Sequence, residues 1–506
     1  MTIRHKIGFW LGLPIFFSIL FLPFPESLPV AGQRTLAVAA LMACWWITEA
    51  IPIPATALLP IVLFPILKVS KVSSVTACYG DSNIFLFMGG FMLAMTMQHW
   101  NLHKRIALHV VKGVGISPNR LVLGFMIATA LLSMWISNTA TTMMMYPIAL
   151  AIVLQYNEFS NGKMGEHELN NFRTVLMLCI AYAASIGGIG TLIGTPPNII
   201  FAASLKKLFP EAPEIGFLQW MMVGIPLVII MIPLTWLLLT KLVYCIKIKT
   251  EETATDDSLK RQIAGLGKIS KAEKLTFAIF IFTAAGWIFR KNIVIGSLTI
   301  PGWSDVLGIA SYVNDATVAI LAAVLLFITP VDLNKGTFLL NWKTASQIPW
   351  GILILFGGGI ALAGGFKDSG LAHWIGSQLH LFGNINQVFI VMITAAVLIF
   401  LTEVTSNTAT ATIFMPVLAA AAITIHIHPF MLMIPATMAA SCAFMLPVAT
   451  PPNAIVFGSG HITVPQMAKA GFGLNLLGIL IITLITYLIA VPVFGIAFHS
   501  FPAWIN

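Results

Sequence analysis

Long apolar runs recur along this chain, separated by short polar segments. About 20 apolar residues suffice to cross the ~30 Å hydrocarbon core of a bilayer. The alternating strands of about ten residues that mark a membrane β-barrel are absent from the pattern. The pattern therefore predicts an all-α polytopic membrane protein. Eleven transmembrane helices are expected at 8–25, 35–48, 53–68, 84–112, 174–205, 217–246, 274–291, 316–330, 348–366, 430–459 and 467–498.

Two further apolar stretches, 121–156 and 386–424, are interrupted by polar residues. The first contains "WISNTATT" and the second contains "TSNTATAT". An apolar arm of 16 residues precedes each interruption, at 121–136 and at 386–401. Such an arm reaches about 24 Å as a helix, which is too short to cross a bilayer. Each stretch is therefore predicted to form a re-entrant hairpin whose polar tip is covered by protein.

The chain also contains an internal repeat. Five of the predicted helices begin between its two copies, and five is odd, so the copies should have opposite orientations. Inverted repeats of this kind are typical of secondary transporters. The matching pairs are "FMGGFMLA" (87–94) with "FGGGIALA" (356–363), "SNTAT" (137–141) with "SNTAT" (406–410), and "GTPPN" (194–198) with "ATPPN" (449–453).

The repeated motifs carry groups that suit an anion and a small cation. In TPPN, Thr195 or Thr450 would cap a helix start, and proline is tolerated in the first helical turn. Helix N-termini attract anions, whereas unwound carbonyls with Ser and Asn oxygens suit Na⁺. A plainer reading is that the Ser and Thr residues bond the i−4 carbonyl within their own helix. Two sets of motifs in register favour the functional reading.

Composition and charge refine the membrane topology. The chain has 506 residues, of which 58% are hydrophobic and 9% are charged, and a formal net charge of +9. Its basic residues lie mostly in short loops, as the positive-inside rule expects, so the charge does not indicate a nucleic-acid partner. Arg4 and Lys6 place the amino terminus in the cytoplasm. An odd number of crossings then places the carboxy terminus on the outer face.

Few charged residues lie near the repeated motifs. No Arg or Lys in the polar clusters could clamp a carboxylate, so hydroxyls, amides and helix N-termini would have to hold an anion. Glu403 is either a proton or cation site or a structural hydrogen-bond acceptor. Glu49 is interpreted as a structural residue near an interfacial turn. His426 and His428 are interpreted as part of an interfacial loop, with a metal pair as the alternative.

Four segments give the chain a resemblance to a known family. They are "WITEAIPIP" (46–54), "FLFMGGFMLA" (85–94), "LTEVTSNTATA" (401–411) and "ASCAFMLPVATPPNAIV" (440–456). In these segments the chain resembles the divalent anion/sodium symporter family, and most closely its bacterial dicarboxylate transporters of the INDY type. The resemblance covers nearly the whole chain. It implies eleven transmembrane segments, two re-entrant hairpins, a homodimer and an elevator mechanism in a bacterial inner membrane.

The resemblance also implies a domain organisation and a set of binding residues. Scaffold helices would occupy 1–117 and 274–384, and the transport domain would occupy 118–247 and 385–506, with a cytoplasmic loop at 248–273. Na⁺ would be the coupling ion, with no organic cofactor. One Na⁺ site would use Ser133, Ser137, Asn138 and the backbone at Gly194. The other would use Thr402, Asn407 and backbone groups at Thr405 and Ala449. Substrate would contact Ser137, Asn138, Thr139, Thr195, Ser406, Asn407, Thr408, Thr450 and Pro452.

These expectations lead to one main functional hypothesis. The chain would import C4-dicarboxylates such as succinate, malate or fumarate together with Na⁺. Alternatives within transport are dicarboxylate exchange, and carriage of another divalent anion such as sulfate or citrate. An anion channel is less favoured because paired occluding hairpins suit alternating access. An intramembrane enzyme is disfavoured because the sequence contains neither HExxH nor GxSxG.

Overall fold

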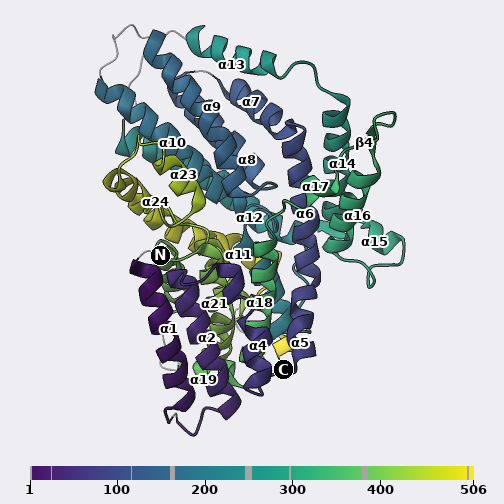
Figure 1. Ribbon diagram of the computed structural model, residues 1–506, viewed down its shortest axis with the longest axis vertical. Helices are drawn as coiled ribbons and strands as arrows, with labels where there is room; N and C mark the ends of the chain where they lie inside the picture. Colours follow the sequence, from purple (N-terminus) through teal and green to yellow (C-terminus); the bar gives the residue numbers. More distant parts are fainter. Residues whose placement is uncertain are drawn as a thin grey trace.

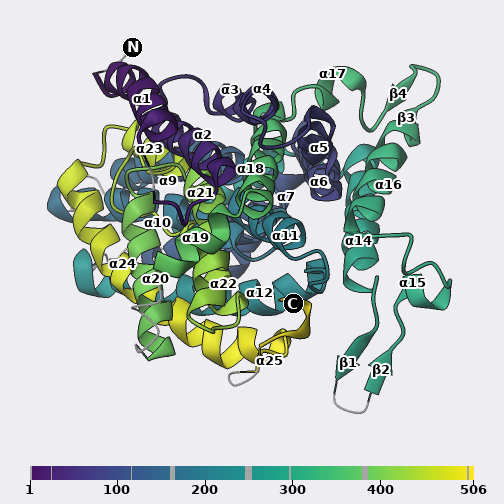
Figure 2. The same ribbon diagram turned by 90° about the horizontal axis from the view of Figure 1, so that it is seen from below.

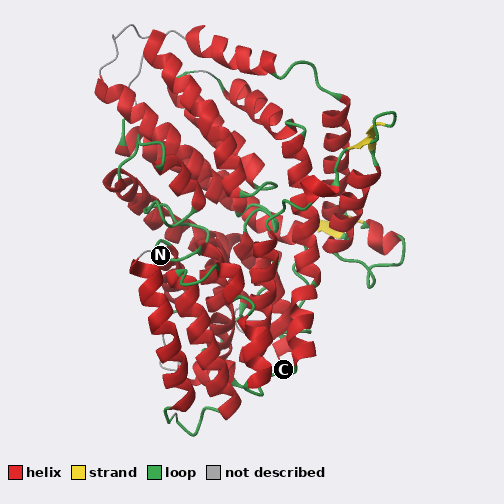
Figure 3. Ribbon diagram, in the orientation of Figure 1, coloured by secondary structure: helices red, strands yellow, loops and turns green. Residues whose placement is uncertain are grey.

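The computed structural model describes residues 3–23, 25–115, 117–159, 166–245, 253–295, 298–378, 386–497 and 501–505, and these are almost entirely helical (Figure 3). The structure also contains two small antiparallel strand pairs, which the sequence analysis did not anticipate. They join β1 (Ile293–Ile295) to β2 (Leu298–Ile300) and β3 (Pro330–Asp332) to β4 (Thr337–Phe338), with Val294 opposite Thr299 in the first pair. The predicted all-α polytopic architecture is confirmed.

The first half of the chain contains the first copy of the repeat. Its α-helices are α1 (Ile3–Phe21), α2 (Val30–Thr48), α3 (Ile53–Thr56), α4 (Leu59–Ile66), α5 (Val72–Ala77), α6 (Ser82–His99), α7 (Leu102–Val114), α8 (Pro118–Ser133), α9 (Asn138–Phe159), α10 (Glu166–Gly188), α11 (Pro196–Leu208) and α12 (Phe217–Leu237). A 3₁₀ turn at Cys78–Gly80 precedes α6, and a π-helical turn at Leu238–Val243 follows α12.

The second half begins with a helix in the polar segment and then contains the second copy. Its α-helices are α13 (Thr253–Gly265), α14 (Lys271–Ile288), α15 (Trp303–Val306), α16 (Asp315–Ile328), α17 (Trp342–Ala345), α18 (Trp350–Asp368), α19 (Leu371–Gln378), α20 (Gln387–Thr402), α21 (Asn407–Thr424), α22 (Phe430–Ala439), α23 (Pro451–Phe457), α24 (Val464–Ile485) and α25 (Val491–Val493). A π-helical turn at Thr486–Ala490 joins α24 to α25, and a 3₁₀ turn lies at Ala503–Ile505.

Several helices are long and apolar enough to cross a membrane. Among the described residues there are six, at Val30–Thr48, Glu168–Gly188, Phe217–Val243, Trp350–Asp368, Asn407–Thr424 and Val464–Val493. Shorter apolar helices of 10–17 residues include both first arms of the hairpins, Pro118–Ser133 and Gln387–Thr402. Each of these arms has 16 residues, the length that the sequence predicted.

The structure confirms two predicted helix breaks and adds a third. The runs 174–205 and 430–459 are interrupted at 189–195 and at 440–450, before the two TPPN motifs. The run 84–112 was expected to be one helix, and this prediction is wrong. It divides at Asn101, whose φ of 56° is left-handed, a conformation that asparagine tolerates better than most residues. The second piece, α7, packs against α8, the first arm of the first hairpin (Figure 1).

The predicted cytoplasmic loop at 248–273 is not a simple loop. It contains α13, which lies at one end of the molecule and packs against α7 and α9 (Figure 1). Leu259 supplies a fully buried contact from this helix. Residues 246–252, where the predicted boundary between 247 and 248 falls, lie outside the described residues. The boundary predicted between 384 and 385 also lies outside them.

Helices α14–α16 and both strand pairs stand to one side of the other helices (Figure 2). The contact between α6 and α16 is close because Gly89 faces the carbonyl of Ala319, only 2.5 Å from where a Cβ would lie. The equivalent glycine of the second copy, Gly358, faces the carbonyl of Ala57 in the same way. Small residues that let helices approach are a common device in membrane proteins.

Candidate substrate and sodium site

The two hairpin tips and the two TPPN helix starts line a single cavity of ≈ 510 Å³. The tips are the turns at 134–137 and 403–406, which join α8 to α9 and α20 to α21. Helices near the start of the chain and α18 complete the wall through Glu49, Ile53, Phe87, Phe91 and Ile352. All nine residues predicted to contact substrate line this cavity, namely Ser137, Asn138, Thr139, Thr195, Ser406, Asn407, Thr408, Thr450 and Pro452.

Helix starts and hydroxyls supply the polar surface of the cavity. No Lys or Arg occurs among the described residues that line it. Thr450 Oγ1 accepts a hydrogen bond from the amide of Asn453 at 3.2 Å, which confirms the predicted cap of α23. The same prediction is wrong for Thr195, whose side chain makes no capping bond to α11. The side chain of Ser406 likewise makes no capping bond to α21. The first amides of this helix therefore remain available to an anion.

Behind the first tip lies a cluster of three oxygens. Ser133 Oγ is 2.6 Å from Asn138 Oδ1 and 2.7 Å from the carbonyl oxygen of Ala184. The hydroxyl has one proton, so it can donate to only one of these acceptors at a time. Ser133 is fully buried, and this leaves an excess of acceptor oxygens in an enclosed place. Hard oxygens gathered in this way are suitable ligands for a cation such as Na⁺.

The second tip has the same cluster at equivalent positions. Thr402 Oγ1 is 2.8 Å from Asn407 Oδ1 and 3.0 Å from the carbonyl oxygen of Ala440. The tip and hydroxyl positions differ by 269 between the copies, which is the offset of the SNT motifs. The structure thus brings together two predicted ligands in each copy, Ser133 with Asn138 and Thr402 with Asn407. The carbonyls of Ala184 and Ala440 are groups that the sequence analysis missed.

The remaining predicted sodium ligands lie at the cavity. Gly194, Thr405 and Ala449 all line it, as do Ser137, Asn138 and Asn407. The Thr405 side chain is engaged within its own hairpin, since Oγ1 lies 2.9 Å from the carbonyl oxygen of Leu401. Any ligand from Thr405 would therefore be its backbone, as the resemblance implied.

The asparagine of each TPPN motif fixes the unwound loop before it. Asn198 Nδ2 donates to the carbonyl oxygens of Gly188 (3.1 Å) and Thr191 (2.7 Å). Asn453 Nδ2 donates to those of Ala443 (3.1 Å) and Leu446 (3.0 Å), which are equivalent positions. These loops are thus held in defined shapes despite lacking helical hydrogen bonds.

Four buried oxygens around these loops have no hydrogen-bond partner in the described part of the chain. They form two repeat-related pairs, which are Ser185 Oγ with Ser441 Oγ and Asn198 Oδ1 with Asn453 Oδ1. Unsatisfied buried polar atoms are rare in folded proteins, so their recurrence in both copies marks these oxygens as candidates to bind a water molecule or a cation. Ser185 and Ser441 occupy matching positions shortly before the two TPPN motifs, and this match was the available signal in the sequence.

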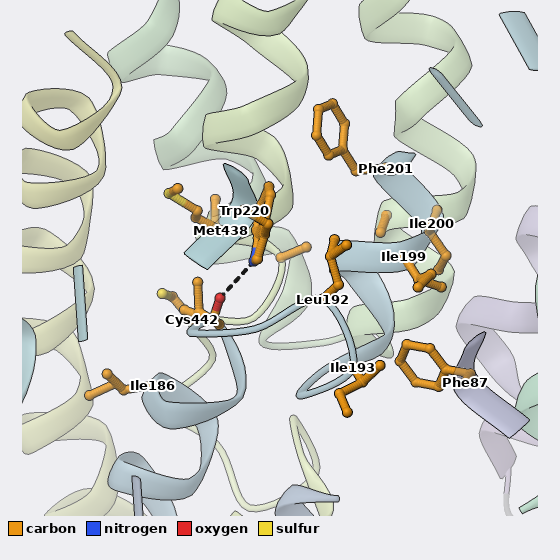
Figure 4. Packing of buried hydrophobic residues seen from close by; sticks show 14 of the residues in the cluster. Phe87, Ile186, Leu192, Ile193, Ile199, Ile200, Phe201, Trp220, Met438 and Cys442 are labelled. Atoms are coloured by element: carbon orange, nitrogen blue, oxygen red, sulfur yellow. Dashed lines mark hydrogen bonds between the residues drawn. The ribbon is translucent and has the colours of Figure 1, made fainter. Parts of the chain in front are cut away.

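Buried apolar residues pack around the first loop (Figure 4). Trp220 is fully buried, and its indole Nε1 donates to the carbonyl oxygen of Ile189 at 2.8 Å (Figure 4). Gly188 approaches the first tip so closely that a Cβ there would lie 2.6 Å from Asn138 Oδ1. The position of the tip therefore depends on the shape of this loop.

Glu403 accepts hydrogen bonds and is not left free at the second tip. Its carboxylate accepts the backbone amides of Phe444, Met445 and Leu446 at 2.7–3.1 Å. Asn475 Nδ2 adds a further bond at 2.8 Å. All of these partners are donors, and the residue is only 3% exposed. Of the two readings left open by the sequence, these bonds favour the structural acceptor.

Two other interpretations are tested by the structure. Glu49 was read as a structural residue at an interfacial turn, but it is exposed and lines the cavity, at the left-handed end of α2 (φ 53°).

His428 Nδ1 accepts a hydrogen bond from the amide of Phe430 at 3.2 Å, and its ring contacts that of Trp504. This arrangement agrees with the interfacial loop read from the sequence.

An ion-pair network joins the segment before α12 to α14 and α16. Arg290 lies 2.9 Å from Glu214 Oε1 and 2.5 Å from Asp315 Oδ1, while Lys291 lies 2.7 Å from Glu214 Oε2. Burial acts to raise the pKa of Glu214, but Arg290 and Lys291 outweigh it and hold that pKa below its ordinary value. The amide of Phe217 also donates to Asp315 at 2.8 Å. These contacts join the ends of α14 and α16 to the segment before α12 in this conformation.

The profile of the sodium:sulfate symporter transmembrane region matches residues 6–496. The chain belongs to this family. Membership confirms the resemblance to the divalent anion/sodium symporters, and it places the chain among transporters and not among enzymes.

Individual relatives agree with this assignment. The chain is 44% identical to the sodium-dependent dicarboxylate transporter SdcS of Staphylococcus saprophyticus, over 98% of this chain and 93% of that one. It is likewise 44% identical to SdcS of Staphylococcus aureus strain MRSA252, over 97% and 92% of the two chains. A solved structure, the YdaH transporter of Alcanivorax borkumensis, matches with a TM-score of 0.57 and 13% identity, covering 91% of this chain and 98% of that one. This last likeness concerns the fold alone.

Proposed function

We propose that this protein imports C4-dicarboxylates such as succinate, malate or fumarate together with Na⁺. The observation that carries the proposal is the pair of repeat-related oxygen clusters behind the two hairpin tips. Each cluster has more acceptors than protons, so a cation would complete it. The name of the SdcS relatives, sodium-dependent dicarboxylate transporters, supports the same substrate and coupling ion.

The cavity in front of the clusters suits a small dianion. Its SNT and TPPN residues offer hydroxyls, amides and helix N-termini from both copies, so each copy can serve one carboxylate. No lysine or arginine lines its described wall, so the two Na⁺ would supply the full positive charges nearest the substrate. Substrate binding would then depend on prior binding of Na⁺, which is how the two gradients become coupled.

The movement would be of the elevator type. The transport domain (118–247 and 385–506) would carry substrate and Na⁺ past a scaffold (1–117 and 274–384) that forms a homodimer. Within the transport domain would lie the hairpins 121–156 and 386–424, the broken helices 174–205 and 430–459, and the helices 217–246 and 467–498. The protein would lie in a bacterial inner membrane, with its amino terminus in the cytoplasm and its carboxy terminus in the periplasm.

Uptake into proteoliposomes tests the proposal. Radiolabelled succinate uptake is measured with an inward Na⁺ gradient and with choline replacing Na⁺, and citrate and sulfate are added as competitors. We expect uptake only with Na⁺ and little competition from either anion. Strong inhibition by sulfate would identify a sulfate carrier instead. Rapid succinate counterflow in Na⁺-free buffer would identify an exchanger.

A further inference from the structure

The two copies of the repeat differ in how the unwound loop is attached to its hairpin tip. In the second copy, Glu403 at the tip binds three consecutive amides of the loop, at Phe444, Met445 and Leu446. The equivalent tip residue of the first copy, 269 positions earlier, is Met134, which has no charge. A carboxylate therefore joins tip to loop in one copy only.

The residue that supports Glu403 is also particular to the second copy. Asn475 on α24 donates to Glu403 Oε1 at 2.8 Å. Helices α12 and α24 correspond at their first turns, where Gln219 and Gln466 each accept a hydrogen bond from the N-cap amide, and this register pairs Val228 with Asn475. A polar pair, Glu403 with Asn475, thus stands where the first copy has an apolar pair.

The same register is confirmed by the backbone contacts of these helices. Gly224 on α12 faces the carbonyl of Ile189, and Gly471 on α24 faces the carbonyl of Phe444, which is the equivalent loop residue. The copies therefore share their backbone arrangement at this point. The two copies differ in the groups that stabilise this arrangement. In the second copy, the Glu403 carboxylate accepts hydrogen bonds from four donors.

We propose that Glu403 is a positioning residue that preorganises the second Na⁺ site, an inference that rests on the proposed function above. Its carboxylate links the tip, which carries Thr402 and Asn407, to the loop that leads to Ala449. Ligands from both segments are thereby held in place before Na⁺ arrives. Hydrogen bonds between a carboxylate and amides are shorter and stronger than neutral ones, so the link is stiff.

The charge of Glu403 has a second effect. A buried carboxylate is costly unless it is hydrogen-bonded, and here the donors are amide dipoles with no counter-ion among the described residues. The net negative charge beside Thr402 therefore remains available to attract a cation at the neighbouring cluster. The second site should bind Na⁺ more tightly than the first and fill before it.

Glu403→Gln tests this inference, because it keeps the shape of the side chain but removes the charge and one acceptor. We expect roughly a tenfold rise in the Na⁺ concentration for half-maximal succinate uptake, as for the loss of about one charge-assisted hydrogen bond. The maximal rate at saturating Na⁺ should largely recover. The matched control is Glu26→Gln, which removes the same charge from the exposed turn before α2 and should leave Na⁺ activation unchanged.

The outcomes separate this inference from the proposed function. If Na⁺ does not activate succinate uptake by the wild-type protein, both the proposed function and the inference about Glu403 are wrong. Normal Na⁺ activation in Glu403→Gln, even with lowered thermal stability, would overturn the inference alone, because a purely structural role predicts that result. If Glu403→Gln does not fold, Asn475→Ala tests the inference in its place, because it keeps the carboxylate and removes one of its hydrogen-bond donors. A smaller rise in the same Na⁺ concentration is expected there, and an unchanged value would overturn the inference.

Discussion

At the scale of single residues, each candidate Na⁺ site depends on a hydroxyl that has too few protons for its neighbours. Ser133 and Thr402 each lie within hydrogen-bond distance of an asparagine oxygen and of a carbonyl oxygen from another segment of the chain. One proton satisfies one acceptor, and the other oxygens are left facing each other. A bound cation removes this repulsion, so Na⁺ and the local structure should stabilise each other.

Asn138 and Asn407 should therefore be essential and equivalent. We expect Asn138→Ala or Asn407→Ala to abolish Na⁺-driven succinate uptake while the protein still folds, because each loses an amide oxygen at a tip. Asn386→Ala is the matched control, since Asn386 is exposed and caps the far end of α20. Uptake into proteoliposomes and Na⁺-dependent thermal stabilisation give the measurement. Normal Na⁺ affinity in either tip variant would refute the assignment.

Glu49 places a negative charge on the wall of the cavity that the polar tips also line. Such a charge should weaken the binding of a dianion, and it also lies unfavourably at the C-terminal end of α2. We expect Glu49→Gln to lower the succinate concentration for half-maximal uptake by about two- to fivefold, since charges separated by water interact by about 1 kcal/mol. The effect should shrink at high ionic strength.

Glu26→Gln serves as the control for this variant, because Glu26 is exposed in the turn that precedes α2, at the opposite end of that helix. It removes the same charge far from the cavity. An equal change in both variants would show that net charge, and not the position of Glu49, is responsible.

At the scale of elements, the features that the sequence predicted are those with a local signal. Polar residues inside apolar arms revealed both hairpins, and glycine or proline marked the breaks before TPPN. The break at Asn101 has no glycine or proline beside it, so the apolar run concealed it. The partners of Glu403 were also hidden, because they are backbone amides more than 40 residues away along the chain. Contacts of this kind depend on tertiary packing, which no local pattern records.

The loop before the first TPPN should control the first tip through Gly188. A methyl group there would lie 2.6 Å from Asn138 Oδ1, closer than real contacts allow, so the tip must shift. We expect Gly188→Ala to raise the Na⁺ concentration for half-maximal uptake strongly, while the helices remain folded. Gly113→Ala is the control, since nothing lies within 4 Å of a Cβ at that position of α7. Equal Na⁺ activation in the two variants would contradict this coupling.

At the scale of the whole molecule, the question is how much charge moves with each substrate. Two repeat-related Na⁺ and one dianion together carry no net charge. Import of the dianion alone against an inside-negative potential costs about 2.3 kcal/mol per charge per 100 mV, or about 4.6 kcal/mol per 100 mV in total. Glu403 is engaged by donors, so its carboxylate is not a free ligand for a third cation.

The unpartnered oxygens of Ser185, Ser441, Asn198 and Asn453 are further candidate ligands for a cation. A third cation would let the membrane potential drive uptake, and we therefore expect inward positive current with more than two Na⁺ per dianion. The measurement is the reversal potential in proteoliposomes at set Na⁺ and succinate gradients. With three Na⁺ per dianion the reversal potential shifts with the logarithm of the cube of the Na⁺ ratio, whereas a flux that does not respond to voltage would limit coupling to two. In that case the two oxygen clusters would be the whole coupling machinery, and the four unpartnered oxygens would need another explanation.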